Sequence, residues 1–265
     1  MHPMLNTAIK AARRAGSVIM RHLDHLDRLT IEQKGRADFV SEVDRLAESE
    51  IIQILHQAYP DTSVLGEESG AHAGNDFCWI IDPLDGTTNF LHGYPQFSVS
   101  IALRHKDKLE QGVVFDPLKN ELFTASRGNG AHLNDRRIRV SRVQQLELSL
   151  IGTGFPFRSF ADLDMWLATF KTFISEASGV RRAGSAALDL AHVACGRFDG
   201  FWEFGLKPWD MAAGCLLIQE AGGLISDIRG GHAYLDSGNI IAGNPKIHAE
   251  MISKISPHLN AGVVA

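Results

Sequence analysis

A hydrophobic run, Trp79-Ile80-Ile81, leads directly into two carboxylates, Asp82 and Asp85, which are three residues apart. Two acids this close repel each other, and burial would also strip them of water. A chain that places them after an apolar run must therefore fold so that something compensates their charge. A hard cation such as Mg²⁺ does this, and phosphate commonly accompanies Mg²⁺ in protein sites.

The residues around the two acids suit such a site. If Asp82 ends a strand and Thr87 begins a helix, both carboxylates lie at an edge of a sheet where α/β proteins commonly bind ligands. The Leu84 carbonyl offers another hard oxygen, and Gly86 lets the backbone approach a phosphate closely. An aspartate-rich turn followed by a helix cap explains the same residues equally well, so both interpretations stay open for the segment alone.

A near copy of the segment occurs at Asp116-Pro117-Leu118, where Lys119 takes the place of the second acid. This copy lies between two apolar runs that are typical of strands. We therefore predict a hairpin turn without a metal there. The Asp-Pro-Leu pattern is informative only where the second carboxylate and Gly-Thr follow.

Three further acids are candidates for the same site. Glu67 follows an apolar pair, Asp210 precedes an alanine-rich helix, and Asp44 lies near the start of another helix. Taken singly, a solvated loop, a helix N-cap and a favourable helix-dipole charge account for them. Metal ligation becomes attractive for Asp210 only if it converges on Asp82 and Asp85.

Composition sets limits on the function. The chain has 265 residues, 45% of them hydrophobic and 22% charged, and its net charge is −5. No global positive field attracts nucleic acid or a membrane surface, and no apolar run is long enough to cross a bilayer. Three widely spaced cysteines argue against a disulfide framework and fit a reducing cytoplasm. There is no His-Glu-x-x-His or Cys-x-x-Cys motif for zinc, no Gly-x-Ser-x-Gly elbow and no Walker-type loop.

Periodicity predicts an α/β protein of layered sheets and helices. We expect a single domain over residues 1–265, with two halves at approximately 1–145 and 146–265. The expected helices span about 3–23, 43–58, 162–176, 185–195, 210–221 and 245–257, with a C-cap at Gly222-Gly223. The expected strands are 63–65, 77–81, 97–103, 112–115, 122–125, 148–152, 224–226 and 240–242.

Four blocks together resemble the inositol monophosphatase family of Mg²⁺-dependent, lithium-sensitive phosphatases. The likeness runs nearly end to end, and the Asp-Pro-Leu-Asp-Gly-Thr block with a downstream Trp-Asp is highly specific. The opening residues 1–6 and the stretch 153–157 look especially like the bacterial SuhB-type branch. The four blocks are Gly66-Glu67-Glu68-Ser69, residues 79–90, residues 184–189 and residues 209–214.

The resemblance assigns the metal ligands. Glu67, Asp82 and the Leu84 carbonyl would bind a first Mg²⁺, and Asp82, Asp85 and Asp210 a second. Glu67 would also touch a third, weaker ion, which gives two to three ions per site. The family's members are layered α-β-α-β-α sandwiches of the inositol monophosphatase and fructose-1,6-bisphosphatase type, commonly homodimers.

The resemblance also implies catalytic and substrate-binding roles. Thr87 would orient the attacking water, with Asp44 accepting a hydrogen bond from its hydroxyl, and Glu67 completes the catalytic set. The amides of Gly86 and Thr87 would hold phosphate, and Glu203 would accept hydrogen bonds from a polyol. The expected substrate-binding set is Asp85, Gly86, Thr87, Gly184, Ser185, Ala186, Glu203 and Asp210.

The implied reaction is hydrolysis of inositol 1-phosphate to inositol and phosphate by direct in-line attack of water. Related small esters stay open as substrates: histidinol phosphate, 3′-phosphoadenosine 5′-phosphate, NADP and fructose 1,6-bisphosphate, because the fold supports all of them. Glu203 favours a neutral polyol over a second phosphate, since a carboxylate repels one.

A role of another class stays open as well. Some SuhB-type relatives are linked to ribosomal RNA antitermination, so transcription factors or RNA polymerase are alternative partners. The relevant feature is a local basic cluster, for which a solvated hairpin is the simpler explanation. Aromatic residues are not interleaved with it, so direct nucleic-acid binding is not expected. The cluster consists of Arg127, Arg136, Arg137, Arg139 and Arg142.

Overall fold

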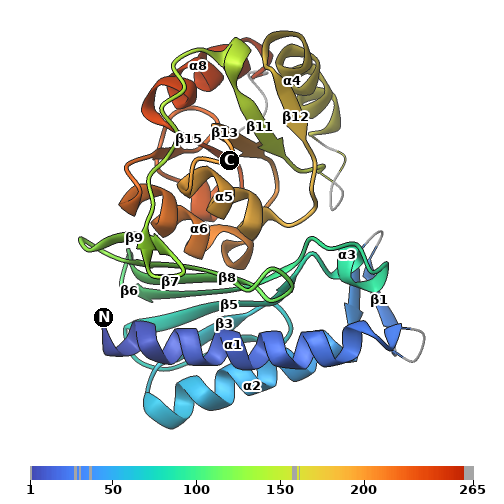
Figure 1. Cartoon of the computed structure of the whole chain (residues 1–265), viewed down its shortest axis with the longest axis vertical. Helices are drawn as coiled ribbons and strands as arrows, with labels where there is room; N and C mark the ends of the chain where they lie inside the picture. The colour runs from blue at the N-terminus through green and yellow to red at the C-terminus, as the bar shows by residue number, and fades with distance from the viewer. Residues whose placement is uncertain are drawn as a thin grey trace.

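Helices and sheets alternate in five layers in the computed structural model (Figure 1). A helix pair covers an eight-stranded sheet, a second pair separates that sheet from a five-stranded one, and a third pair covers the far side (Figure 1). The expected α-β-α-β-α sandwich is therefore confirmed. The structure describes residues 2–26, 29, 31–35, 38–156, 160 and 162–259.

The first layer consists of α1 (Pro3–Leu23) and α2 (Glu42–Ala58), close to the predicted ranges. Each helix buries one apolar stripe against the sheet, as its amphipathic pattern requires. A short hairpin, β1 (Ile31–Gly35) and β2 (Asp38–Ser41), leads into α2. Ser41 caps α2, and Asp44 accepts the Ser41 backbone N–H in return, so the helix begins with a capping box.

The eight-stranded sheet is antiparallel except for the parallel pair of β3 and β5. Helices cover both of its faces, so its central strands are buried on both sides. The short strands β4, β9 and β10 were not expected from the sequence. In spatial order the strands are β10 (Arg136–Arg137), β9 (Gly130–Leu133), β8 (Glu121–Ser126), β7 (Lys108–Asp116), β6 (Ser98–His105), β5 (Phe77–Asp85), β3 (Ser63–Gly66) and β4 (Gly70–His72).

Strand β5 corrects one prediction, because it does not end at Asp82. Asp82 pairs with Ser100 and Asp85 pairs with Ser98, so three steps on β5 match two on β6. The extra residue forms a bulge, in which Pro83 has no N–H to contribute to the ladder. The bulge keeps both acids on the strand, and it is a device that commonly redirects side chains next to sites.

The hairpin predicted at the near-copy segment is confirmed. Asp116 ends β7 and its carboxylate accepts the backbone N–H groups of Leu118 and Lys119, at 3.0 and 2.9 Å. The Lys119 ammonium group lies 2.6 Å from the second carboxylate oxygen. A lysine and two amides thus compensate this buried acid.

The middle layer, α5 (Ala186–Ala194) and α6 (Pro208–Glu220), is almost entirely buried. It lies between both sheets, so α6 is apolar on every side. Gly214 allows the two helices to pack closely, since a Cβ there would lie 2.5 Å from Leu190. Gly222, with φ of +88°, follows the end of α6 as expected for a glycine C-cap.

The second sheet orders its strands β12-β11-β13-β15-β14, and α4 and α8 cover its outer face (Figure 1). Strand β13 was not predicted, although it is buried throughout. The expected strand at 148–152 begins at Leu150, because a 3-10 turn occupies Leu146–Leu148. The elements are β11 (Leu150–Thr153), α4 (Leu163–Glu176), β12 (Gly179–Arg181), β13 (Gly200–Glu203), β14 (Leu224–Ser226), α7 (Tyr234–Ser237), β15 (Ile240–Gly243), α8 (Pro245–Ile255) and a 3-10 turn at Ser256–His258.

The cysteines Cys78, Cys195 and Cys215 are all free thiols, as their spacing predicted. In the part of the chain that the structure describes, every helix is too short or too polar to cross a bilayer.

One partly buried histidine, His192, gives the fold a pH dependence. His192 on α5 packs edge-on against Phe198, at 5.4 Å between ring centroids, and also against Phe123. Burial, followed by the nearby Arg197, lowers the pKa of His192 to about 4. The unfolded chain, with an ordinary histidine pKa, takes up a proton first as the pH falls.

We therefore expect stability to be lost as the pH falls through the ordinary histidine range toward 4. His192 should contribute a loss of about 2 kcal/mol in the free energy of unfolding between about pH 7 and about pH 5. Urea denaturation of the native protein and of a His192→Phe variant at both pH values measures this. Equal losses in the two proteins would show that His192 does not carry the effect.

Candidate active site

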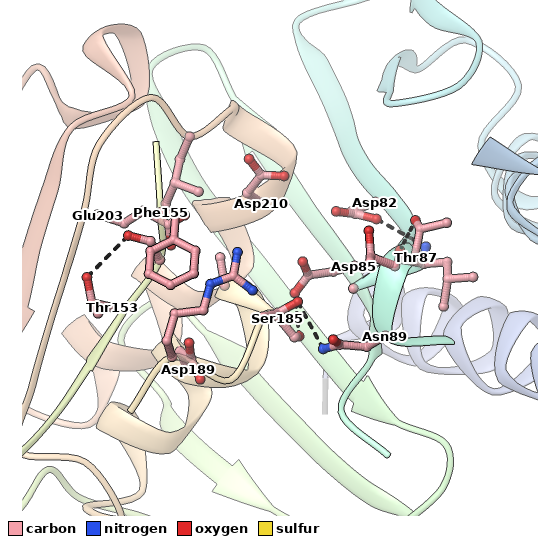
Figure 2. A pocket seen from close by; sticks show the side chains of 18 of the residues that line it. Asp82, Asp85, Thr87, Asn89, Thr153, Phe155, Ser185, Asp189, Glu203 and Asp210 are labelled. Atoms are coloured by element: carbon pink, nitrogen blue, oxygen red, sulfur yellow. Dashed lines mark hydrogen bonds between the residues drawn. The ribbon is translucent and has the colours of Figure 1, made fainter. Parts of the chain in front are cut away.

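A cavity of about 270 Å³ lies where the two halves of the chain meet. Figure 2 shows Asp82, Asp85, Thr87 and Asn89 on one side of it and Asp210, Glu203 and Asp189 on the other. Every predicted metal-ligating and substrate-binding residue lines this cavity. These residues are Glu67, Asp82, Leu84, Asp85, Gly86, Thr87, Gly184, Ser185, Ala186, Glu203 and Asp210.

Asp82 is an almost completely buried acid at the wall of the cavity. It is 1% exposed. Burial raises its pKa well above the ordinary aspartate value, and the charges of Glu67, Asp85 and Asp210 raise it further. A hydrogen bond with the Glu67 side chain adds to the effect. The acids that the sequence placed far apart are thus close enough to interact strongly.

Asp85 connects the two halves of the molecule. The Ser185 hydroxyl donates to its Oδ2 at 2.5 Å, and the Ala187 backbone N–H donates to the same oxygen at 2.8 Å. Burial raises the pKa of Asp85 to about 7, although the Ser185 bond opposes this rise. The start of α5 is therefore docked directly onto a carboxylate of β5.

Asp210 occupies a different position in its helix from the predicted N-cap. Lys207 is the N-cap of α6, because Pro208 takes the first helical position, which needs no N–H donor. Asp210 is the third residue of the helix, and its Oδ2 accepts the Lys207 backbone N–H at 2.7 Å. The N-cap prediction is wrong, but the carboxylate still lines the cavity beside Asp82.

Thr87 begins α3 (Thr87–Leu91) and is held from two sides. Its hydroxyl lies 2.9 Å from Asp44 Oδ1 and 3.0 Å from the Leu84 carbonyl oxygen. Asp44 is fully buried behind the cavity and also accepts both the hydroxyl and the backbone N–H of Ser41. With its proton directed to these acceptors, Thr87 presents oxygen lone pairs, which can accept a hydrogen bond from water.

Gly86 is required by its surroundings. Its φ is +94°, and a Cβ would lie 2.8 Å from the Gln96 carbonyl oxygen and 3.2 Å from that of Gly184. The helix it opens has five residues, so the predicted phosphate cradle depends on close backbone approach more than on a helix dipole.

Glu203 stands at the other end of the cavity, on β13. A Cβ at Gly154 would lie 2.0 Å from its carboxylate, so any larger residue there would displace the Glu203 side chain. The Thr153 hydroxyl donates to the Trp202 carbonyl oxygen at 2.9 Å and fixes β13 beside β11. Gly154 thus has a packing role beside Glu203.

Several cavity residues had no role assigned from the sequence. Asp189 is 1% exposed, and its Oδ1 has no hydrogen-bond partner. Burial, and then Glu203 and Asp85, raise its pKa well above the ordinary value. The Arg182 guanidinium lies 4.4 Å from the centre of the Phe155 ring at the same cavity. Asp189 appeared in the sequence only as the last residue of a motif block, with no pattern to distinguish it from a helix-dipole charge.

Carboxylate and carbonyl oxygens are the donors that Mg²⁺ prefers. Among the described residues, no three His, Cys, Asp or Glu side chains are arranged as a ready cage for a metal ion. The raised pKa values nevertheless show that acids crowd around Asp82 with excess negative charge. The donor set therefore fits a hard divalent cation, which would draw these side chains inward.

Asn89 allows a test of the contact between the two halves of the chain, because it forms hydrogen bonds to both. Its side-chain amide donates to the carbonyl oxygens of Gln96 at 2.7 Å, Ala183 at 2.9 Å and Gly184 at 3.3 Å, which belong to both halves. We expect Asn89→Ala to lower the free energy of unfolding by about 1–3 kcal/mol, because it leaves partly buried carbonyls without donors.

The matched control is Asn129→Ala, which removes an exposed amide that donates to one carbonyl oxygen. This change should cost less than about 0.5 kcal/mol. Chemical denaturation of both variants measures the difference. Equal costs would contradict a role for Asn89 in joining the halves.

Comparison with known proteins agrees with this architecture. The model of the inositol monophosphatase family matches residues 1–260. The Nus factor SuhB of Pseudomonas aeruginosa is 53% identical, over 98% of each chain. The structure of the extragenic suppressor protein suhB from Bartonella henselae is 45% identical, with a TM-score of 0.94 over 99% of this chain and 100% of that one. Inositol monophosphatase from Anabaena is 38% identical, with a TM-score of 0.84 over 96% and 95%.

The resemblance based on the sequence blocks is thereby confirmed over nearly the whole length. In the two further stretches 1–6 and 153–157, Met1 and Phe157 lie outside the described residues. The family match and the motif residues that line the cavity point to the same conclusion. The chain belongs to the inositol monophosphatase family.

Proposed function

We propose that this chain is a Mg²⁺-dependent phosphomonoesterase that hydrolyses inositol 1-phosphate and related small phosphate esters. One observation carries the proposal: acids from both halves, Asp82 and Asp85 on β5 and Asp210 on α6, interact in one cavity with Glu67. A fold held together by hydrophobic packing alone has no need of such an arrangement, which is costly without a cation.

In this proposal the metal ligands are shared between two or three ions. Glu67, Asp82 and the Leu84 carbonyl hold the first, and Asp82, Asp85 and Asp210 the second, with Glu67 beside a weaker third. Bound Mg²⁺ would neutralise phosphate oxygens and lower the pKa of a coordinated water. The hydrogen bonds on Asp85 Oδ2 and Asp210 Oδ2 fix these ligands, as is usual around metal sites.

Thr87 and Asp44 orient the attacking water. Asp44 and the Leu84 carbonyl lie within hydrogen-bond distance of the Thr87 hydroxyl proton, so the threonine oxygen accepts a hydrogen bond from water and aims it at phosphorus. Among the residues that line the cavity there is no histidine or cysteine, and the Ser185 hydroxyl donates to Asp85. Direct attack by water therefore accounts for the reaction better than a covalent phosphoenzyme.

The amides of Gly86 and Thr87 hold the phosphate in this proposal, and the residues from Gly184 to Ala186 border it. Glu203 accepts hydrogen bonds from the hydroxyl groups of the substrate. Asp189, whose Oδ1 has no hydrogen-bond partner, lies close enough to Glu203 for the Glu203 charge to raise the pKa of Asp189. Two acids at this end of the cavity disfavour a second phosphate group and favour a neutral polyol.

The metal ligands are tested by two isosteric substitutions. Asp85→Asn and Asp210→Asn each remove a ligand charge, so we expect phosphate release to fall by at least about a hundredfold, which is about 2.7 kcal/mol in activation free energy. Asp107→Asn, on an exposed turn, is the control and should keep full activity. Circular dichroism confirms the fold of each variant. Near-normal turnover of either ligand variant at saturating Mg²⁺ would refute the assignment.

Substrate choice is tested by a panel of esters at fixed Mg²⁺. We expect inositol 1-phosphate to be hydrolysed faster than 3′-phosphoadenosine 5′-phosphate, NADP and fructose 1,6-bisphosphate, because Glu203 repels a second anion. We also expect it to be hydrolysed faster than histidinol phosphate, and this expectation rests on the family resemblance alone. The ratio kcat/KM for each ester is the measurement. A clear preference for a bisphosphate would contradict this interpretation of the cavity.

A second function is favoured by the name of the relatives, which are called Nus factors. We propose that the chain also binds the transcription machinery, with transcription factors or RNA polymerase as partners, independently of catalysis. The basic cluster is the candidate contact, although Arg127 already pairs with Glu110 and donates to the Leu109 carbonyl oxygen. Equal recovery of these partners by the native protein and by Asp85→Asn would support the role, and recovery by neither would leave only the enzyme.

Homodimerisation is a further part of the proposal, which rests on the family resemblance. Measurement of the molar mass in solution by light scattering tests it. A mass near 58 kDa, about twice the 29.0 kDa of the chain, is expected.

A further inference from the structure

A second buried carboxylate lies one helical turn after Asp44 on α2. Glu48 is 2% exposed, and it faces the sheet side of the helix as Asp44 does. Its Oε2 accepts the backbone N–H of Glu68 at 3.0 Å, and its Oε1 accepts that of Ser69 at 2.7 Å. One side chain therefore binds both amides that directly follow Glu67.

The contact continues to the residue before Glu67. A Cβ at Gly66 would lie 2.6 Å from Glu48 Oε2, so the carboxylate rests directly on the glycine backbone. The Glu67 N–H itself donates to the Ile81 carbonyl oxygen on β5, at 3.1 Å. The backbone around Glu67 is thus held by β5 on one side and by Glu48 on the other.

Helix packing alone does not explain this choice of residue. A buried carboxylate costs several kcal/mol unless donors compensate it, and an apolar residue would fill the same space without that cost. The hydrogen bonds from the two backbone N–H groups compensate the Glu48 charge only in one conformation of the loop. The free energy of burying the Glu48 carboxylate therefore depends on the position of the Glu67 backbone. In a similar way, the Asp44 carboxylate is linked to Thr87 by a hydrogen bond.

We propose that Glu48 is a positioning residue, which fixes the backbone of Glu67 so that its carboxylate meets the divalent cation of the site. The inference rests on the proposed function, since it concerns a ligand of the proposed first Mg²⁺. Glu48 lies outside the residues that line the cavity, and it acts through Glu67. Its loss should weaken cation binding and leave the hydroxyl and phosphate contacts of the substrate in place.

The test is Glu48→Gln in the full-length protein, with Mn²⁺ as the probe cation. Glutamine keeps the volume and one acceptor oxygen, but it turns an NH₂ group toward the second amide donor. Free Mn²⁺ measured by electron paramagnetic resonance gives the affinity without any reference to turnover. We expect the affinity to fall by about tenfold or more, as for other groups that orient metal ligands.

Kinetics provide a second measurement. The Mg²⁺ concentration that gives half-maximal phosphate release should rise by a similar factor, whereas the KM for the ester at saturating Mg²⁺ should stay near its native value. The control is Glu50→Gln, two residues further along α2, where an exposed pair with Arg14 at 2.8 Å is removed. It should change neither quantity, because exposed ion pairs contribute little.

The outcomes separate the two proposals. Native Mn²⁺ affinity in a folded Glu48→Gln variant would overturn this inference and leave the proposed function standing. Failure of the native protein to bind Mn²⁺ would overturn the proposed function and this inference with it. If Glu48→Gln does not fold, Glu48→Asp keeps the charge but shortens its reach, and native affinity in that variant would overturn the inference instead.

Discussion

Negative charge held away from water at the junction of the two sheets is the constraint on which the rest of the structure depends. Asp82 lies within a strand covered on both faces and is almost completely buried, and the charges of Glu67, Asp85 and Asp210 further oppose its ionisation. The protein responds by surrounding its buried acids with donors. Asp85 accepts hydrogen bonds from the Ser185 hydroxyl and the Ala187 N–H, and Asp210 accepts one from the Lys207 N–H. On α2, Asp44 and Glu48 accept hydrogen bonds from further backbone N–H groups and, for Asp44, from a hydroxyl.

These hydrogen bonds give the acids a structural role. The bond from Ser185 to Asp85 joins α5 to β5, and Asn89 binds the same segment of the second half from α3. On the outer side, α2 holds Thr87 and the loop of Glu67 through two carboxylates one turn apart. Functional residues from distant parts of the chain are therefore fixed relative to one another by contacts that end on the acids themselves.

Local patterns predicted much of this structure. The helical periodicity of α1 and α2, the hairpin at Asp116 and the glycine after α6 all depend on neighbouring residues, and all were confirmed. The four motif blocks identified the family, and their acids line one cavity. The metal and substrate roles of these residues stay predictions.

The remaining features depend on tertiary contacts that no local pattern records. The bulge in β5 follows from its pairing with β6, and Asp210 is the third residue of its helix because Pro208 opens α6. Strand β13 was not predicted, although it is buried throughout and carries Glu203. Glu48 resembles any acid on an amphipathic helix until the Glu67 loop folds back onto it. Asp189 likewise becomes notable only when the cavity forms around it.

In the proposed function the buried acids of the two halves share divalent cations. The anomalous difference density of a crystal soaked with Mn²⁺ measures this directly. We expect density within coordination distance of Asp82 and of at least one partner from the other half, Asp210, with Glu67 and Asp85 completing the shells. Density that is absent from the cavity, or that contacts neither Asp82 nor Asp210, would contradict it.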